Sequence, residues 1–172
     1  IPNNPFETDL DRRPSNFQPL TPITLMERSA SIYPDKTAII HGSHRVSYSD
    51  FWNRSCRLAS ALSRRGIGRG DTVSVMAPNI PQMLEAHFGV PMSGAVLNSL
   101  NIRLDGQSIA HILDHGEAKV LITDTEFSAV IKEALASCSQ KPLVIDIDDP
   151  EGTGGEKLGS LNYEVFLNEG DP

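Results

Sequence analysis

Cysteine is scarce in this chain of 172 residues, and long apolar runs are absent. The two cysteines, Cys56 and Cys138, stand far apart, which excludes both a disulfide-stapled scaffold and a cage of thiolates around a metal ion. No run of about 18 apolar residues occurs, so we predict no membrane-spanning helix. No basic segment followed by an apolar stretch opens the chain, so a secretion signal has no support. We therefore expect a reduced, cytoplasmic protein.

An excess of positive charge is also missing. Lys and Arg number 15 against 22 Asp and Glu, and the net charge of -7 argues against a general nucleic-acid binder. The charge is uneven, because residues 1–104 carry 11 basic and 8 acidic side chains, whereas residues 105–172 carry 4 and 14. We interpret the densest basic stretch as a solvated helix face rather than a phosphate-binding patch. It comprises Arg45, Arg54, Arg57, Arg64, Arg65 and Arg69.

What is present is an ordinary globular mixture, with 39% hydrophobic and 22% charged residues, enough for one domain. Four prolines and little periodicity predict an extended surface arm over residues 1–20. From 148 to 159 the chain turns to Gly, Asp and Glu, so we expect a linker over 148–172 with a short helix at 162–167, and we expect Asp148 and Asp149 to be solvated there. The first residue is Ile1 rather than Met, which suggests that the chain is cut from something longer.

Between these ends, over residues 21–147, short apolar strands alternate with amphipathic helices. This alternation predicts an α/β fold with a mostly parallel sheet flanked by helices. Predicted helix caps are Thr21, Ser49, Asn79 and Asp105. The expected elements are a helix over 22–33, a hairpin over 37–48, a helix ending at Gly66, a strand at 72–76, a helix to Met92, a strand at 95–98, a helix to His115, a strand at 119–123, a helix over 125–137 and a strand at 142–146.

Several apparent motifs lack the context that their chemistry needs. The G-x-G start at Gly66 follows a helix and precedes a strand, the reverse of a dinucleotide fingerprint, so we predict a helix C-cap and turn. The glycines of 152–155 lack the spacing of a phosphate loop and are typical of a flexible linker. His111 and His115 share a helix face, but Ile112 stands where a zinc protease needs Glu. No G-x-S-x-G nucleophile elbow occurs.

Five ordinary segments become specific in combination. They are VSYSDF at 46–51, RLASAL at 57–62, GIGRGDTVSVMAPN at 66–79, GAVLNSLNIRL at 94–104, and IL at 112–113 leading to AKVLI at 118–122. In this order and with these gaps, residues 21–172 resemble the amino-terminal portion of the AMP-forming acyl-coenzyme A (CoA) synthetases, the adenylate-forming superfamily. The stretch GVPMSGAV at 89–96 resembles the branch for short- and medium-chain acids, which includes methylthiopropionate-type substrates.

The resemblance implies a two-step reaction. A small carboxylic acid and MgATP give an acyl-adenylate and pyrophosphate, and CoA then displaces AMP to give the thioester, so ATP, Mg²⁺ and CoA are implied for the full-length enzyme. The family's glycine-rich phosphate loop, its adenine and ribose segments and its catalytic lysine are not in this sequence. We therefore expect an amino-terminal fragment that is inactive alone, holds none of these ligands and no catalytic residue or metal site, and pairs with the missing carboxy-terminal portion. An exposed apolar patch and self-association are also expected.

Arg103 is the one candidate ligand contact. It follows a predicted strand and precedes a helix, at the edge where α/β sheets bind ligands. The resemblance implies that an arginine of this Asn-x-Arg-Leu segment contacts a CoA phosphate, and a surface arginine that caps local carbonyls is the alternative. Two other functions stay open at this point, a Rossmann-like dinucleotide-binding module and a catalytically dead interaction protein on the same scaffold.

Overall fold

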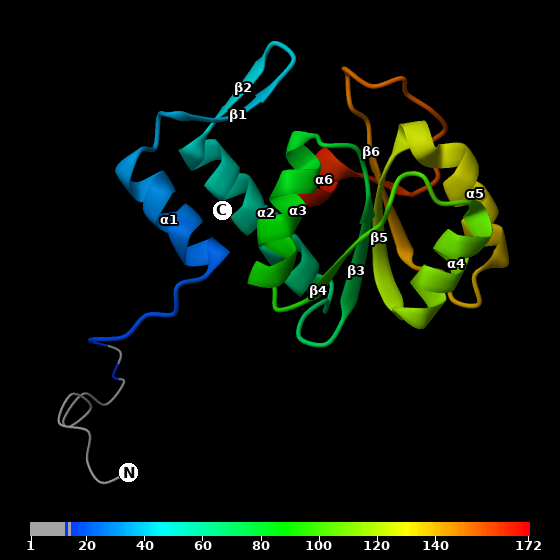
Figure 1. The fold of residues 1–172 in the computed structure, drawn as a ribbon, viewed down its shortest axis with the longest axis horizontal. Helices are drawn as coiled ribbons and strands as arrows, with labels where there is room; N and C mark the ends of the chain where they lie inside the picture. The colour runs from blue at the N-terminus through cyan, green and yellow to red at the C-terminus, as the bar shows by residue number, and fades with distance from the viewer. Residues whose placement is uncertain (1–12, 14) are drawn as a thin grey trace, which may run out of the picture.

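Five short strands form a parallel sheet in the order β4-β3-β5-β6-β7, which confirms the predicted fold class (Figure 1). The computed structural model describes residues 13 and 15–172, so most of the predicted arm over 1–20 lies outside the described residues. The strands are β3 (Thr72–Met76), β4 (Val96–Ser99), β5 (Ala118–Asp124), β6 (Leu143–Ile147) and β7 (Leu161–Asn162).

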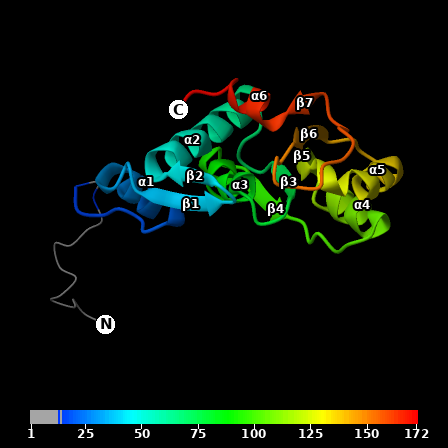
Figure 2. The ribbon, with the colours of Figure 1, turned by 90° about the horizontal axis from the view of Figure 1, so that it is seen from above.

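Helices cover both faces of this sheet, as the alternating pattern predicts (Figures 1 and 2). One face packs against α2 (Tyr48–Arg64), α3 (Pro81–Met92) and α6 (Tyr163–Leu167), whose fully buried side chains include Leu58, Leu62, Ala86 and Phe166. The other face packs against α4 (Gly106–His115) and α5 (Ser128–Ser137), which bury Ile109, Leu113 and Ile131. A 3₁₀ turn, η1 (Thr125–Phe127), joins β5 to α5. None of the helices in the described part of the chain combines the length and apolarity that a bilayer crossing requires.

A smaller layer precedes the sheet. Helix α1 (Pro22–Ile32) begins at Thr21, whose hydroxyl accepts a hydrogen bond from the Thr24 amide, with proline at the first helical position as predicted. Strands β1 (Thr37–His41) and β2 (His44–Ser47) form the predicted antiparallel hairpin, turning at Gly42, whose φ of +55° suits glycine. A small core joins this layer to α2 and α3, with the rings of Phe51 and Phe88 edge to face at 5.3 Å.

Two predicted helix caps are wrong, and Asp105 is confirmed, since its carboxylate accepts a hydrogen bond from the Ser108 amide at 2.9 Å. Helix α2 follows β2 without a loop, so Ser47, still extended, accepts from the Asp50 amide, and Ser49 already lies inside the helix. Helix α3 begins at Pro81, which pushes the preceding Ile80 into extended backbone at the cap position in place of Asn79.

The carboxy-terminal stretch is more ordered than its composition predicts. Residues 161–162 add β7 to the edge of the sheet, and α6 follows at once. Tyr163, Phe166 and Leu167 are at most 2% exposed and belong to the core under α2 and α3. The stretch 161–167 is anchored to the sheet because Leu161, Tyr163, Phe166 and Leu167 pack in this core.

Candidate functional site

The carboxyl ends of β3 and β5 form the place where a sheet of this kind binds ligands. The chain leaves β3 into α3 on one face and leaves β5 into η1 and α5 on the opposite face. Adjacent parallel strands whose connections diverge in this way leave a crevice outside their carboxyl ends. The topology therefore directs attention to the residues that follow β3, β5 and β6.

Two buried polar side chains stand at the end of β5. Asp124 and Thr125 are each 1% exposed, and Asp124 Oδ2 and Thr125 Oγ1 have no hydrogen-bond partner among the described residues. Burial raises the pKa of the Asp124 carboxyl, and the neighbouring Glu126 and Asp149 carboxylates add to the rise. Within residues 13 and 15–172 no three His, Cys, Asp or Glu side chains are arranged to hold a metal ion. The carboxyl group at this position favours its proton more than a surface aspartate does.

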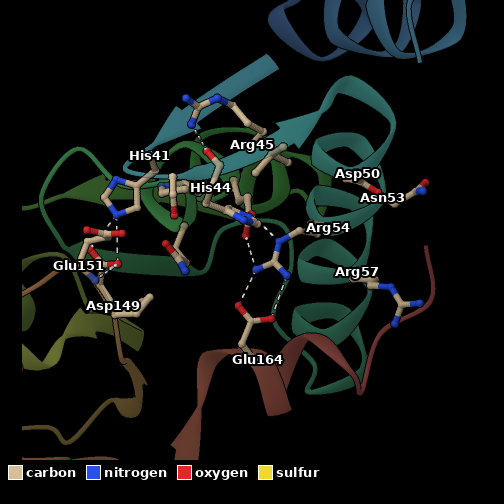
Figure 3. A pocket seen from close by; sticks show the side chains of 16 residues that line it. His41, His44, Arg45, Asp50, Asn53, Arg54, Arg57, Asp149, Glu151 and Glu164 are labelled. Carbon is tan, nitrogen blue, oxygen red and sulfur yellow. Dashed lines mark hydrogen bonds and ion pairs between the residues drawn. The ribbon is translucent and has the colours of Figure 1, made fainter. Parts of the chain in front are cut away.

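Beside this edge lies a polar cleft of about 800 Å³. Its walls come from the β1–β2 hairpin, α2, the start of α3, the loop after β6, and α6, as Figure 3 shows. The cleft thus joins segments that are far apart in the sequence. Two sets of charged side chains cross it, one centred on Asp149 and one on Arg54 (Figure 3).

Asp149 closes one end of the cleft. The Nε2 atom of His41 lies 3.0 and 3.1 Å from its two carboxylate oxygens, and the Asp149 side chain is only 5% exposed. The prediction that both acids of this loop are solvated is therefore wrong for Asp149, because the hairpin folds over it from 108 residues away. Asp148 is half exposed and pairs with Lys157.

Arg54 links three helices at the other end of the cleft. Its guanidinium donates to both oxygens of Glu85 on α3, at 2.6 and 3.2 Å, and to both oxygens of Glu164 on α6, at 2.8 and 2.6 Å. Glu85 is fully buried and also accepts the Tyr163 hydroxyl at 2.9 Å. Burial opposes the charge of Arg54, but the hydrogen bonds to Glu164 and Glu85 outweigh it and raise its pKa. Burial and the same Glu85 carboxylate raise the pKa of Tyr163.

Three arginines of the basic stretch are paired rather than simply solvated. Besides Arg54, Arg65 pairs with Glu169 at 2.6 Å, and Arg64 bonds to the Glu169 carbonyl and the Asp171 carboxylate. Arg64 and Arg65 stay exposed, as the interpretation as a solvated helix face predicts. That interpretation is wrong for Arg54, which is half-buried and pairs with the buried Glu85. Carboxylates already neutralise the charge of Arg54, Arg64 and Arg65, so these three do not form a free phosphate-binding patch.

Arg103 lies in the exposed β4–α4 loop, at the carboxyl edge of the sheet. Its amide donates to Asn101 Oδ1 at 3.0 Å, so Asn101 is a turn residue of this loop. Its guanidinium has no ion-pair partner among the described residues, and Arg103 does not line the polar cleft. Arg103, the one site residue predicted from the sequence, is thus separate from the polar cleft. The cleft itself was missed, and the only sequence signal for it is the density of arginine in α2.

The remaining candidate motifs have structural roles. Gly66 has a φ of +76° just after α2, which confirms the predicted helix end, and the following turn leads into β3 rather than out of a strand. The dinucleotide-binding alternative loses its support with this order. The rings of His111 and His115 stack on the exposed face of α4, and His87 Nδ1 lies 2.8 Å from the Met83 carbonyl oxygen.

Comparison with known proteins identifies a family that this chain resembles in sequence. Residues 26–164 match the family described as AMP-binding enzyme. A peroxisomal acetate/butyrate–CoA ligase of Arabidopsis thaliana is 42% identical over 95% of this chain and 31% of its own length. An acetate–CoA ligase of Humulus lupulus is 40% identical over 95% and 31%. The benzoate–CoA ligase of Arabidopsis thaliana, also peroxisomal, is 41% identical over 95% and 29%.

Solved structures share the fold. An anthranilate–CoA ligase in complex with anthranoyl-AMP superposes with a TM-score of 0.80 and 19% identity, over 93% of this chain and 30% of the other. A benzoate–CoA ligase from Burkholderia xenovorans gives 0.75 and 20% identity, over 87% and 28%. The chain spans about 30% of the length of the curated relatives it matches. It belongs to the family of AMP-binding enzymes.

Proposed function

We propose that this chain is the amino-terminal portion of an ATP-dependent acyl-CoA ligase. A carboxylate oxygen of the acid bonds to the α-phosphorus of ATP and pyrophosphate leaves; the CoA thiolate then bonds to the acyl carbon and AMP leaves. The observation that carries the proposal is 42% identity to a named CoA ligase along 95% of the chain. The test is to extend the coding sequence past residue 172 and assay carboxylate-dependent ATP–pyrophosphate exchange. An extended protein that lacks exchange with every acid tested contradicts the proposal.

Residues 1–172 alone are proposed to be inactive. The sequence holds no glycine-rich phosphate loop, and the described residues offer no cluster of ligands for Mg²⁺, so the groups that stabilise phosphate charge have to come from elsewhere in the ligase. Pyrophosphate exchange by the purified chain would contradict this. A catalytically dead interaction protein on the same scaffold is the alternative, and a coding sequence that stops near residue 172 would favour it.

The proposed substrates are small carboxylic acids. Relatives named for acetate, butyrate and benzoate support this class, and so does the short- and medium-chain resemblance of residues 89–96. A panel of straight-chain and aromatic acids, assayed with the extended ligase, ranks them by kcat/KM. Preference for acids longer than about twelve carbons would contradict the proposed branch.

Arg103 is proposed to contact a phosphate of CoA. Its guanidinium is exposed at the carboxyl edge of the sheet and has no ion-pair partner among the described residues, which suits a charge-assisted hydrogen bond. In the extended ligase, Arg103→Ala should raise the KM for CoA about tenfold, since such a bond is worth about 1.5 kcal/mol, and should leave pyrophosphate exchange unchanged. Arg69→Ala is the matched control, another exposed arginine without an ion-pair partner among the described residues. An unchanged KM for CoA would leave the surface-arginine alternative.

Apolar side chains near the hairpin are proposed to contact the rest of the ligase. Ile40 and Leu84 are 65% and 40% exposed and flank a groove of about 280 Å³ that also includes Met83. Without a covering segment such a surface favours self-association. Size-exclusion chromatography of residues 1–172 at rising concentration tests this, and a monomer at all concentrations contradicts it.

A cytoplasmic location also stays a proposal, with the peroxisome of several relatives as the alternative outcome of fluorescence microscopy.

A further inference from the structure

The carboxy-terminal segment lies along α2 and contacts a stripe of polar residues on that helix. In both views the end of the chain lies next to α2 (Figures 1 and 2). The contacts begin at Arg54 with Glu164 and continue to Arg64 and Arg65 at the end of the helix. Besides its core contacts, the helix therefore holds by polar contacts a segment about 110 residues later.

Side chains of α2 bind the backbone of the carboxy-terminal segment, so the main chain of this segment is held in a fixed position. The Asp171 amide donates to the hydroxyl of Ser60 at 3.1 Å, and the Arg64 guanidinium donates to the Glu169 carbonyl. Between them, a Cβ on Gly170 would lie 2.9 Å from the Ala61 nitrogen and would collide with the Arg57 carbonyl. Only glycine lets the segment cross the helix this closely. A segment that merely rested on solvated arginines would need neither the glycine nor the bonds to its backbone.

Side-chain charges reinforce the crossing. Arg65 donates to both oxygens of Glu169, at 2.9 and 2.6 Å, and this hydrogen bonding lowers the pKa of that carboxyl. Arg64 pairs with Asp171, and Arg54 holds both oxygens of Glu164. A single exposed ion pair contributes little, but paired bidentate contacts along one helix fix direction as well as distance.

We propose that the α2 stripe, made of Arg54, Ser60, Arg64 and Arg65, is a positioning surface that fixes where and in which direction the chain leaves this sheet. The inference rests on the proposed function, in which the larger part of the ligase follows this portion. These residues act by holding residues 163–171, so that the next segment of the ligase starts from one defined point. Without the contacts of Ser60, Arg64 and Arg65 the sheet stays folded and the exit point becomes mobile.

The first test uses residues 1–172 and amide hydrogen exchange by NMR. Gly170→Ala and, separately, Arg65→Glu should speed hydrogen exchange of the amides at positions 170 and 171 about tenfold and leave the amides of β3 and β5 unchanged. The double variant Arg65→Glu with Glu169→Arg should restore slow exchange, because it reverses the pair. The matched control is Arg69→Glu, an exposed arginine close to the end of α2 with no ion pair to the segment. The proposal is overturned if hydrogen exchange at positions 170 and 171 is unchanged in both single variants, or if the control Arg69→Glu speeds it equally.

The second test uses the ligase extended beyond residue 172. Arg65→Glu should lower kcat for pyrophosphate exchange about tenfold with an unchanged KM for the carboxylate, and Glu169→Arg in the same protein should restore kcat. An active ligase whose kcat does not respond overturns the positioning role. An extended ligase that is inactive even without substitution refutes the proposed function. In that case the amide hydrogen exchange of residues 1–172 still decides whether the α2 stripe holds residues 163–171.

Discussion

On the α4–α5 side of the sheet every charged side chain of the two helices stays at the surface, whereas the α2–α3–α6 side buries the carboxylate of Glu85 completely. Both sides enclose an apolar core. On the second side, however, Arg54 and Tyr163 must reach Glu85 from two other helices to satisfy it. A buried carboxylate without such partners would cost several kcal/mol.

The difference separates what builds the fold from what builds a site. The α4–α5 layer packs an apolar core and buries no charged side chain of its two helices. The other layer carries the polar cleft, the His41–Asp149 contact and the docking of the carboxy-terminal segment. Substitutions on the two sides should therefore act through different physical terms, and the following experiments test that expectation.

The largest effect is expected on the α2 side. Arg54→Ala removes the cation from the fully buried Glu85 and should lower the free energy of unfolding by about 4 kcal/mol. Urea unfolding followed by circular dichroism measures it. The control is Lys132→Ala on α5, whose pair with Glu156 is mostly exposed and is worth less than about 1 kcal/mol. If both variants lose the same stability, the contrast between the two layers fails.

A core truncation on the α4–α5 side should come next. Ile131→Ala leaves a cavity under the sheet at a residue that is 0% exposed, and should cost about 3 kcal/mol. Unlike Arg54→Ala, its effect should not depend on salt, because no charge is involved. Val165→Ala, at a position 57% exposed, is the control. A loss below about 1 kcal/mol would mean that this layer is not held by apolar burial.

Helix capping distinguishes the predicted from the observed start of α2. Ser47→Ala should cost about 1 kcal/mol, because the Asp50 amide loses its acceptor. Ser49→Ala should change the unfolding free energy by less than about 0.5 kcal/mol, since alanine is favoured inside a helix. The opposite ranking of the two variants would restore the cap predicted from the sequence.

The smallest effect concerns the cap of α4 on the other side. Hydrogen bonds from the Ser108 amide and hydroxyl lower the pKa of Asp105 below its ordinary value of 3.8. The carboxylate form therefore stabilises the fold fully above that value, and the contribution disappears as pH falls through the lowered pKa. Asp105→Asn keeps the cap and loses the charge, so it should be slightly less stable at neutral pH and equal to the parent in acid. A gap between the unfolding midpoints that persists in acid would contradict this.

The sequence predicts most of the fold because its signals are local. The helices from α2 to α5 and the strands from β3 to β6 follow from apolar periodicity, and Asp105 was recognised because a cap and its amide lie three residues apart. Ser49 and Asn79 were misplaced where neighbouring structure decides the helix start, a strand without a loop in one case and Pro81 in the other. Strand β7 has two residues, too few for any pattern.

The candidate site was only partly predictable for the same physical reason. Arg103 could be placed at the carboxyl edge because strand, loop and helix follow one another in the chain. The sequence by itself determined the parallel sheet, the two helical layers and the resemblance to a family. Tertiary structure alone decided that Arg54 meets Glu85 and Glu164, that Asp149 is buried under His41, and that Gly170 crosses α2. Those contacts join residues 31 to 113 positions apart, and no local preference specifies a partner at that distance until the core has brought the segments together.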